Sequence, residues 1–329
     1  MSVSFSVLDL APVVSGGTSA QALRNTLDLA RRAERLGYRR YWLAEHHAMP
    51  GIASSAPAVL VGQVAAATST MRIGSGGVML PNHAPMVVAE QFGTLEALYP
   101  GRIDLGLGRA PGTDQATARA LRRAPGPLSA DDFPEQVVEL RSYFAADSTV
   151  TPAAGNEPPI WLLGSSGFSA RLAGLLGMPF AFAHHFSAAN TEPALKLYRE
   201  TFRPGALDEP YAMIGVSVIA AETDERAREL AAPQALSFLL LRRGNPGPLP
   251  SPEEAAAYPY TPLEREMIEA RLAEQVVGGP ETVRKDLDAL VERTGVDEVM
   301  VMTQVHDHGD RLRSYEILAD LYPASLRPR

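Results

Sequence analysis

The sequence contains no cysteine among its 329 residues. That absence excludes disulfide bridges, thiolate metal sites, iron–sulfur clusters and a cysteine nucleophile. The sequence also lacks any run that approaches the roughly 20 apolar residues of a membrane-spanning helix. The sequence also has no long run of basic residues. Its 30 Lys and Arg stand against 38 Asp and Glu, which gives a net charge of −8. This balance argues against nucleic acid or an anionic membrane as a partner.

The first residues of the chain do not have the pattern of a signal peptide. Met1–Phe5 carries no basic residue, and no long apolar stretch follows it. Hydrophobic residues make up 46% of the chain and charged residues 21%, which is enough to bury a large core. We therefore expect a soluble, cytoplasmic protein.

Short apolar runs alternate with helical patterns along the whole chain. Eight such runs indicate strands, a number that favours a (β/α)8 TIM barrel of the α/β class over an open doubly wound sheet. We predict a single barrel domain over residues 1–329, with insertions after strands 4 and 7. The predicted strands are Ser4–Leu10, Tyr41–His46, Arg72–Leu80, Arg102–Gly108, Ile160–Leu163, Phe180–Ala183, Met213–Ala220 and Glu298–Thr303. The predicted helices are Ser19–Leu36, Pro57–Ser69, Ala84–Leu98, Asp132–Phe144, Phe168–Leu176, Glu192–Phe202, Asp224–Leu240, Pro280–Arg293 and Asp310–Leu321.

Two local features qualify this outline. Ser19 is the expected N-cap of the first helix, and Gly37 its C-terminal stop. The segment Gly244–Pro262 is rich in proline and is predicted to be irregular. Such a segment is either a functional lid or simple disorder, and we keep it as the candidate lid.

Histidines gather where the predicted strands end. His46 and His47 follow the run Tyr41–Ala44, with Glu45 directly before them, and the remaining histidines are His83, His184, His185, His306 and His308. The C-terminal ends of barrel strands converge on the face where substrates and cofactors bind. The pattern therefore favours a pocket lined by ionisable groups, and the alternative is a set of hydrogen-bonded rim residues.

An anion site is indicated after the fifth strand. Gly164–Gly167 contains Ser165 and Ser166 and directly precedes a helix, whose free N–H groups and dipole suit a phosphate. Ser169 adds a third hydroxyl, and Arg109, one residue past strand 4, adds a positive charge on the same face. The alternative is an ordinary serine N-cap.

Two glycine-rich stretches are not dinucleotide fingerprints. The stretch that begins at Gly106 has Pro111 where the fingerprint needs glycine, and the one that begins at Gly74 has Met79 there. We expect no independent Rossmann site for NAD.

Several long motifs in the same order resemble the bacterial luciferase-like flavin monooxygenases. The matching stretches are Trp42–His47, Ile73–Pro81, Tyr99–Arg109, Val276–Val283 and Arg311–Glu316. The resemblance covers nearly the whole chain and implies a (β/α)8 barrel that uses reduced FMN or, in some branches, the deazaflavin F420.

The resemblance assigns roles to individual residues. It implies a catalytic histidine at His46 with Glu45 and His47 beside it. It implies a non-prolyl cis peptide at Gly76-Gly77 under the flavin ring. Flavin and phosphate contacts are implied for Gly108, Arg109, Ser165, Ser166 and Ser169. No metal is implied.

This sequence also departs from luciferase itself. Gly108 stands where luciferase has a cysteine near the reactive flavin carbon, and Ser165 where it has an acid. The resemblance therefore favours a single-chain monooxygenase that emits no light over a luciferase.

The implied reaction joins reduced FMN, supplied by a separate flavin reductase, with O2 at the flavin C4a carbon to give a peroxyflavin. His46 would move a proton, and the oxygen would go to a small organic substrate by hydroxylation, epoxidation or Baeyer–Villiger insertion. The alternative on the same fold is an F420-dependent oxidoreductase.

Two further alternatives come from other classes of protein. One is a metal-dependent barrel hydrolase built on His306 and His308, and the other a flavin-binding protein without turnover. Small apolar residues between Ala56 and Ala66 could pack against a partner or simply against the barrel. Members of the family that this sequence resembles are often dimers, which favours a homodimer.

Overall fold

The computed structural model describes residues 3–110, 117, 120–121 and 132–326. Eight parallel strands follow one another around a closed barrel, which β10 completes by pairing with both β1 and β8. The TIM-barrel prediction is therefore confirmed. The barrel strands are β1 Ser4–Asp9, β2 Arg40–Leu43, β3 Arg72–Ser75 with its continuation β4 Val78–Met79, β5 Ile103–Gly108, β6 Ile160–Gly164, β7 Phe180–Phe182, β8 Ala212–Ala220 and β10 Glu298–Met302.

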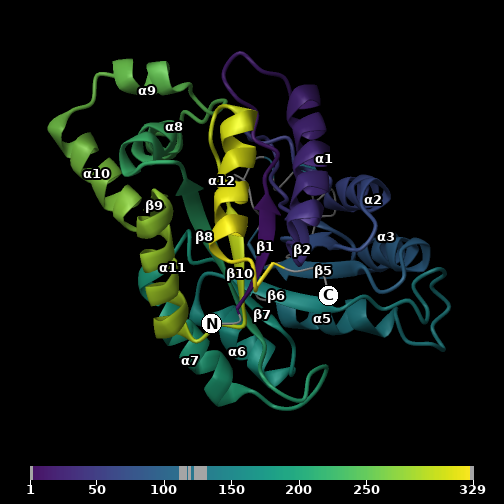
Figure 1. Cartoon of the computed structure of the whole chain (residues 1–329). Helices are drawn as coiled ribbons and strands as arrows, with labels where there is room; N and C mark the ends of the chain where they lie inside the picture. The colour runs from purple at the N-terminus through teal and green to yellow at the C-terminus, as the bar shows by residue number, and fades with distance from the viewer. Residues whose placement is uncertain (1–2, 111–116, 118–119, 122–131, 327–329) are drawn as a thin grey trace.

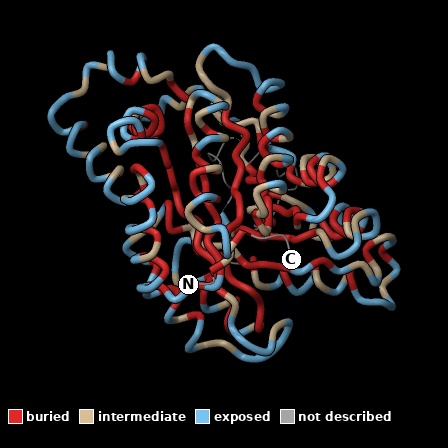
Figure 2. Tube along the Cα trace, viewed as in Figure 1, coloured by how far each residue is buried: buried red, intermediate tan, exposed pale blue. Residues whose placement is uncertain are grey.

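Helices pack around the outside of the barrel strands (Figure 1). In Figure 2 the strands and the inward sides of the helices are buried, while the outer loops are exposed. The helices that follow the strands are α1 Ser19–Leu36, α2 Pro57–Ala67, α3 Pro85–Leu98, α5 Phe133–Ser142, α6 Gly167–Leu175, α7 Thr191–Thr201, α8 Asp224–Arg242, α11 Pro280–Thr294 and α12 His308–Leu321, with short 3-10 turns at η1 Leu80–Asn82 and η3 Ala188–Asn190.

Three sequence predictions about element boundaries are wrong in detail. The predicted strand Arg72–Leu80 is divided into β3 and β4 at Gly76-Gly77, and β2 ends at Leu43 rather than at His46. The N-cap of α1 is Thr18, whose side chain accepts from the Gln21 N–H. Propensity alone could not distinguish Thr18 from Ser19, since both are good caps.

The insertion after the seventh barrel strand is more regular than predicted. It contains α9 Pro252–Ala257, α10 Pro262–Ala273 and the short strand β9 Val276–Gly278, which pairs with β8. Both helices begin with a capping box, Ser251 with Glu254 and Thr261 with Glu264. This signal was present in the sequence and was overlooked. The insertion after the fourth strand lies mostly outside the described residues.

The segment Gly244–Pro262 packs against the turn between β1 and α1. Leu249 exchanges backbone hydrogen bonds with Val13 and Ser15, at 2.8 Å each. The Ser15 hydroxyl donates to Glu254 of α9 at 2.8 Å. The segment therefore packs as part of the scaffold in this structure.

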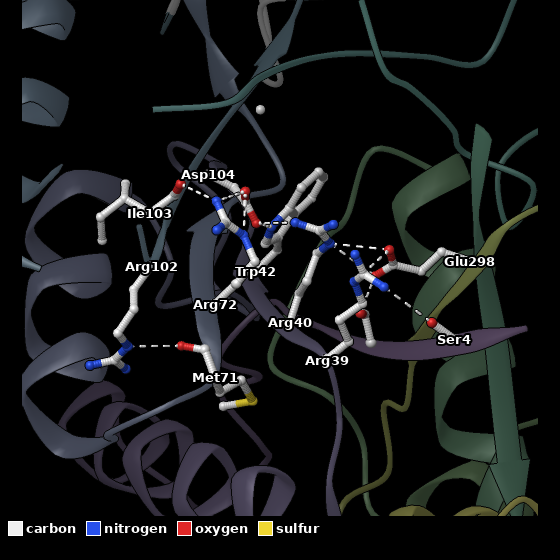
Figure 3. A network of polar contacts seen from close by, with 12 residues as sticks. Ser4, Arg39, Arg40, Trp42, Met71, Arg72, Arg102, Ile103, Asp104 and Glu298 are labelled. Carbon is white, nitrogen blue, oxygen red and sulfur yellow. Dashed lines mark hydrogen bonds and ion pairs between the residues drawn. The ribbon is translucent and has the colours of Figure 1, made fainter. Parts of the chain in front are cut away.

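A buried charged network closes the barrel at the N-terminal ends of its strands (Figure 3). Arg40 at the start of β2 binds Asp104 of β5 at 2.7 Å and Glu298 of β10 at 3.1 Å. Arg72 at the start of β3 binds the other oxygen of Asp104 at 2.6 Å. Burial acts to raise the pKa of Asp104, but Arg40 and Arg72 outweigh it and hold the pKa below its ordinary value. This face therefore serves stability, and chemistry is left to the opposite face.

Among the described helices, none is both long enough and apolar enough to cross a membrane.

Candidate active site

A mostly apolar cavity of about 220 Å³ opens at the C-terminal ends of the barrel strands. Its walls come from all eight barrel strands and from the loops that follow them. The lining includes eight of the ten residues that the sequence analysis assigned to the site: His46, Gly76, Gly77, Gly108, Arg109, Ser165, Ser166 and Ser169. The other two, Glu45 and His47, lie behind this wall. Apolar lining residues are Leu8, Leu10, Trp42, Ala44, Met79, Ala110, Leu163, Ala181, Phe182, Ala183, Phe186, Met213 and Met300.

His46 reaches the cavity because the chain after β2 is fixed on both sides. The Ala44 N–H donates to the Asp9 carbonyl at 3.0 Å, which continues the pairing with β1 beyond the strand. The His46 N–H donates to the Ser54 carbonyl, also at 3.0 Å. Ala48, two residues later, has φ +52°, a left-handed conformation that a non-glycine residue seldom adopts. The turn after β2 is thus constrained at the point where it carries the histidines.

Glu45 is fully buried and holds two histidines and a backbone group. The Nε2 atoms of His47 and His83 donate to Glu45 Oε1 at 2.7 and 2.8 Å. Glu45 Oε2 accepts from the Met79 N–H at 3.0 Å. The carboxylate therefore ties the loop after β2 to the loop after β4, and both loops contribute residues to the cavity wall.

The hydrogen bonds around Glu45 favour its charged form. Burial acts to raise the pKa of Glu45, but the hydrogen bonds from His83, His47 and the Met79 N–H outweigh it and lower the pKa below 4.5, the ordinary value. Glu45, His47 and His83 each have one possible metal-ligand atom, and these three atoms lie within 4.8 Å of one another. Residues of these types also suit a metal ion. In this structure the two imidazole nitrogens are engaged by the carboxylate itself.

Closely packed glycines form the wall beside His46. The peptide Gly76-Gly77 is cis, as the resemblance implied. A Cβ on Gly77 would lie 2.7 Å from the Gly106 carbonyl oxygen, and one on Gly76 would lie 2.7 Å from Leu8 Cδ1. A Cβ on Gly108 would lie 2.8 Å from Met79 Sδ. The bare backbone is therefore needed for strands β3 and β5 to meet around the cavity.

One end of the cavity is suited to an anion. Arg109 follows β5 directly, and its guanidinium lies over the Phe168 ring of α6 at 4.1 Å. Ser166 is the N-cap of α6, and its side chain makes no cap hydrogen bond to the N–H groups of the first turn. Ser165 and the buried Ser169 place hydroxyls at the same edge. A guanidinium, a helix N-terminus and three hydroxyls at one end of the cavity fit a phosphate.

The floor of the cavity rests on the charged network. Trp42 lines the cavity, and its Nε1 donates to Asp104 Oδ2 at 3.2 Å (Figure 3). Trp161 packs edge-on against Trp42 at 5.2 Å and lies 4.8 Å from the Arg40 guanidinium. The same carboxylate thus closes the barrel and orients the indole under the cavity.

The seven histidines take different places. His46 and His185 line the cavity, while His47 and His83 bind Glu45. His184 contacts Thr191 at 2.8 Å, and His306 donates to the Ser15 carbonyl at 3.2 Å. His308 faces Asp28 at 3.0 Å.

The predicted convergence of the histidines therefore holds for four of them. His306 and His308 do not converge on a common ligand position, which removes the basis for a metal-dependent hydrolase built on them. Sequence reasoning left two residues of this region without a role, His83 and His185, because their hydrogen-bond partners lie 38 and 30 residues away in the chain.

Some relatives that match nearly the whole chain are named as monooxygenases, and others are uncharacterized proteins. The profile of the luciferase-like monooxygenases matches residues 3–298. The uncharacterized protein YvbT of Bacillus subtilis (strain 168) is 58% identical over 324 residues, 96% of each chain. A luciferase-like monooxygenase of Escherichia coli (strain K12) is 49% identical over 326 residues, 97% of each chain. The N-acetyl-S-alkylcysteine monooxygenase of B. subtilis is 35% identical over 338 residues, 99% of this chain and 100% of that protein.

Solved structures agree with these relatives. Apo-MsnO8 superimposes with a TM-score of 0.91 at 42% identity, covering 99% of this chain and 100% of that one. The fold is shared at 18% identity by the oxygenating constituent of 3,6-diketocamphane monooxygenase from Pseudomonas putida in complex with FMN (TM-score 0.72, 100% of each chain). An F420-dependent secondary alcohol dehydrogenase shares it at 17% identity (TM-score 0.72, 99% of each chain). The chain is an oxidoreductase that belongs to the luciferase-like monooxygenase family.

Proposed function

We propose that this protein is a flavin-dependent monooxygenase that uses reduced FMN and O2 to oxygenate a small, mostly apolar organic molecule. The observation that carries this proposal is the cavity, which combines a mostly apolar interior with an end suited to an anion. A flavin mononucleotide has the same division, an isoalloxazine ring at one end and a phosphate at the other.

The residues present fit FMN. Gly76, Gly77 and Gly108 bring bare backbone to the cavity, so a planar ring can lie against the wall without meeting side chains. Arg109 and the N-terminus of α6 would hold the phosphate. Proteins of this fold bind FMN in one case and F420 in another, which supports a flavin-type cofactor.

When bound, reduced FMN supplies the electrons that activate O2. The protein has three tasks in this proposal. The apolar lining excludes water from the reacting centre. His46, which lines the cavity, would hold or release a proton at its imidazole. Glu45, with His47 and His83, keeps the loop that carries His46 in place, and thus acts as a positioning group rather than a catalytic one.

The substrate proposed here is a small apolar compound. The lining is dominated by aliphatic, aromatic and methionine side chains, and methionines adapt to different ligand shapes. The relative that is 35% identical carries the name N-acetyl-S-alkylcysteine monooxygenase, which supports a small organic substrate.

Two partners belong to the proposal. A separate reductase supplies the reduced flavin, since the sequence has no dinucleotide fingerprint of its own. A second copy of the chain packs on the apolar side chains that α2 and α3 leave exposed. These are Val59 (64% exposed), Met86 (43%), Val87 (45%) and Leu98 (65%). Burying these side chains against a partner would remove apolar surface from water.

Anaerobic titrations with reduced FMN, oxidised FMN and F420, followed by admission of air, test the function. A monooxygenase should bind reduced FMN most tightly and should react with O2 in stopped-flow absorbance. Binding of F420 alone, without reaction with O2, would make the protein a hydride-transfer enzyme.

A pair of histidine variants separates an enzyme from a passive flavin carrier. His46→Ala should keep the affinity for FMN while the reaction of the bound flavin with O2 changes. His308→Ala, whose ring pairs with Asp28 away from the cavity, should behave as the wild type. If His46→Ala changes nothing, the protein is a flavin carrier without turnover.

A further inference from the structure

His185 is a cavity residue to which neither the sequence nor the proposed chemistry gives a role. It follows β7, is 6% exposed and lines the cavity. Its backbone N–H and its Nδ1 both lie 2.9 Å from the carbonyl oxygen of Gly215 in β8. The ring is therefore held against the neighbouring strand at two points.

The contact with Gly215 fixes which ring nitrogen carries the proton. A carbonyl oxygen only accepts hydrogen bonds, so Nδ1 must be the protonated nitrogen. Burial lowers the pKa of His185 to about 4, and the nearby Arg271, His184 and His46 act in the same direction. The ring is therefore neutral near pH 7, and its Nε2 carries a lone pair rather than a proton.

Nε2 has no hydrogen-bond partner among the residues that the structure describes, and the opposite nitrogen is held on β8. Nε2 is therefore the polar atom that the ring can offer to the cavity. Among the described residues that line the cavity, none carries a carboxylate or a carboxamide, and Arg109 is a donor only. His185 is thus a scarce acceptor in this cavity.

Strand β8 is built to receive this ring. A Cβ on Gly215 would lie 2.9 Å from His185 Nδ1 and 3.0 Å from Cε1, so any larger residue would displace the imidazole. Glycine in the interior of a strand otherwise weakens it. The exposed ring of Phe186 packs against the imidazole with centroids 4.5 Å apart.

We propose that His185 is a fixed hydrogen-bond acceptor that selects ligands carrying an N–H or O–H group at its Nε2. The inference rests on the proposed function, since the ligand is either the cofactor or the molecule to be oxygenated. The imide N–H of a flavin ring and an amide N–H or hydroxyl of a substrate share this donor chemistry. An apolar molecule with a single donor group fits the lining best.

The first test is a nitrogen-15 NMR spectrum of histidine-labelled protein near pH 7. Before any ligand is added, His185 should be neutral with the proton on Nδ1. A protonated ring, or a proton on Nε2, would overturn the inference. This reading does not depend on FMN being the cofactor, so it stands apart from the proposed function.

The second test compares FMN with 3-methyl-FMN, which lacks the imide N–H, in anaerobic titrations of the wild type and His185→Phe. If the donor comes from the cofactor, the wild type should prefer FMN by about 3- to 10-fold, the effect of one neutral hydrogen bond, and the variant should bind both alike. His184→Phe is the matched control, because His184 is equally buried but contacts Thr191 outside the cavity. It should keep the preference.

The third test covers the other source of the donor. Indole and 1-methylindole differ in one N–H and are titrated into the FMN-loaded protein, while the Nε2 resonance of His185 is followed. If the donor comes from the substrate, indole should shift this resonance and bind about 3- to 10-fold tighter than 1-methylindole, a preference that His185→Phe abolishes.

The outcomes of these tests are separable. Failure to bind FMN would overturn the proposed function. F420, whose ring carries the same imide, then takes the place of FMN in the titrations. If neither FMN, F420 nor indole moves the Nε2 resonance, the acceptor role is wrong and His185 is a packing residue. Should His185→Phe not fold, the wild-type resonance alone decides.

Discussion

Arg109→Met tests whether the anion-binding end of the cavity holds the phosphate of the cofactor. The substitution removes the guanidinium at the end of β5 while leaving an apolar side chain on the Phe168 ring, which Arg109 contacts at 4.1 Å. A hydrogen bond to a charged group is worth about 1.5–3 kcal/mol. At about 1.4 kcal/mol per tenfold change, FMN should bind about 10- to 150-fold more weakly.

The assay is a fluorescence titration with FMN and with riboflavin, which has the same ring and no phosphate. The wild type should bind FMN more tightly, and Arg109→Met should bind the two with similar affinity. Riboflavin binding should change by less than about twofold, since no charged partner is lost. Arg265→Met is the matched control, because Arg265 lies over Tyr260 in the insertion at 5.4 Å and does not line the cavity.

Two results would contradict the reasoning. An equal loss for both ligands would mean that Arg109 supports the cavity wall rather than binding the phosphate. An unchanged affinity for FMN would place the phosphate elsewhere on the rim.

Four further outcomes are expected. Asp104→Asn leaves Arg40 and Arg72 without their shared carboxylate, so it should cost about 3–5 kcal/mol and lower Tm by about 4–7 °C in calorimetry. Glu200→Gln in the exposed pair on α7 should cost less than about 0.5 kcal/mol, and equal losses would refute the network's role. Glu45 has a lowered pKa, so its contribution to stability is present above its ordinary value of 4.5 and is lost as the pH falls below it. The unfolding free energies of wild type and Glu45→Gln should therefore converge in acid, and a constant gap would be inconsistent with an ionised Glu45. Dialysis against EDTA should leave FMN affinity unchanged, because the histidines beside Glu45 are held by the carboxylate; a loss would indicate a metal site. Val59→Glu should give monomers in light scattering if α2 and α3 form the dimer interface, and an unchanged mass would place the interface elsewhere.

Local sequence patterns were sufficient for the architecture. Alternation of apolar strands with helices predicted the barrel, because each element needs its neighbours to cover its apolar face. The same rules predicted the ends of individual strands and helices less accurately. Strand β2 ends three residues before His46 because the pairing with β1 stops after the Ala44 N–H, which binds the Asp9 carbonyl, and the His46 N–H turns to Ser54 in the following loop. Propensity does not encode pairing of that kind.

Some residues of the site were predicted from the sequence, and others were found only in the structure. The sequence by itself determined that Arg109, Ser165 and His46 follow strand ends, and a closed parallel barrel brings all such ends to one face. Only the tertiary structure decided which residues face the cavity. His185 does so because Gly215, on the adjacent strand, holds its ring, whereas its neighbour His184 faces Thr191. Those contacts join residues far apart in the chain, and they form only when the strands pair in one register.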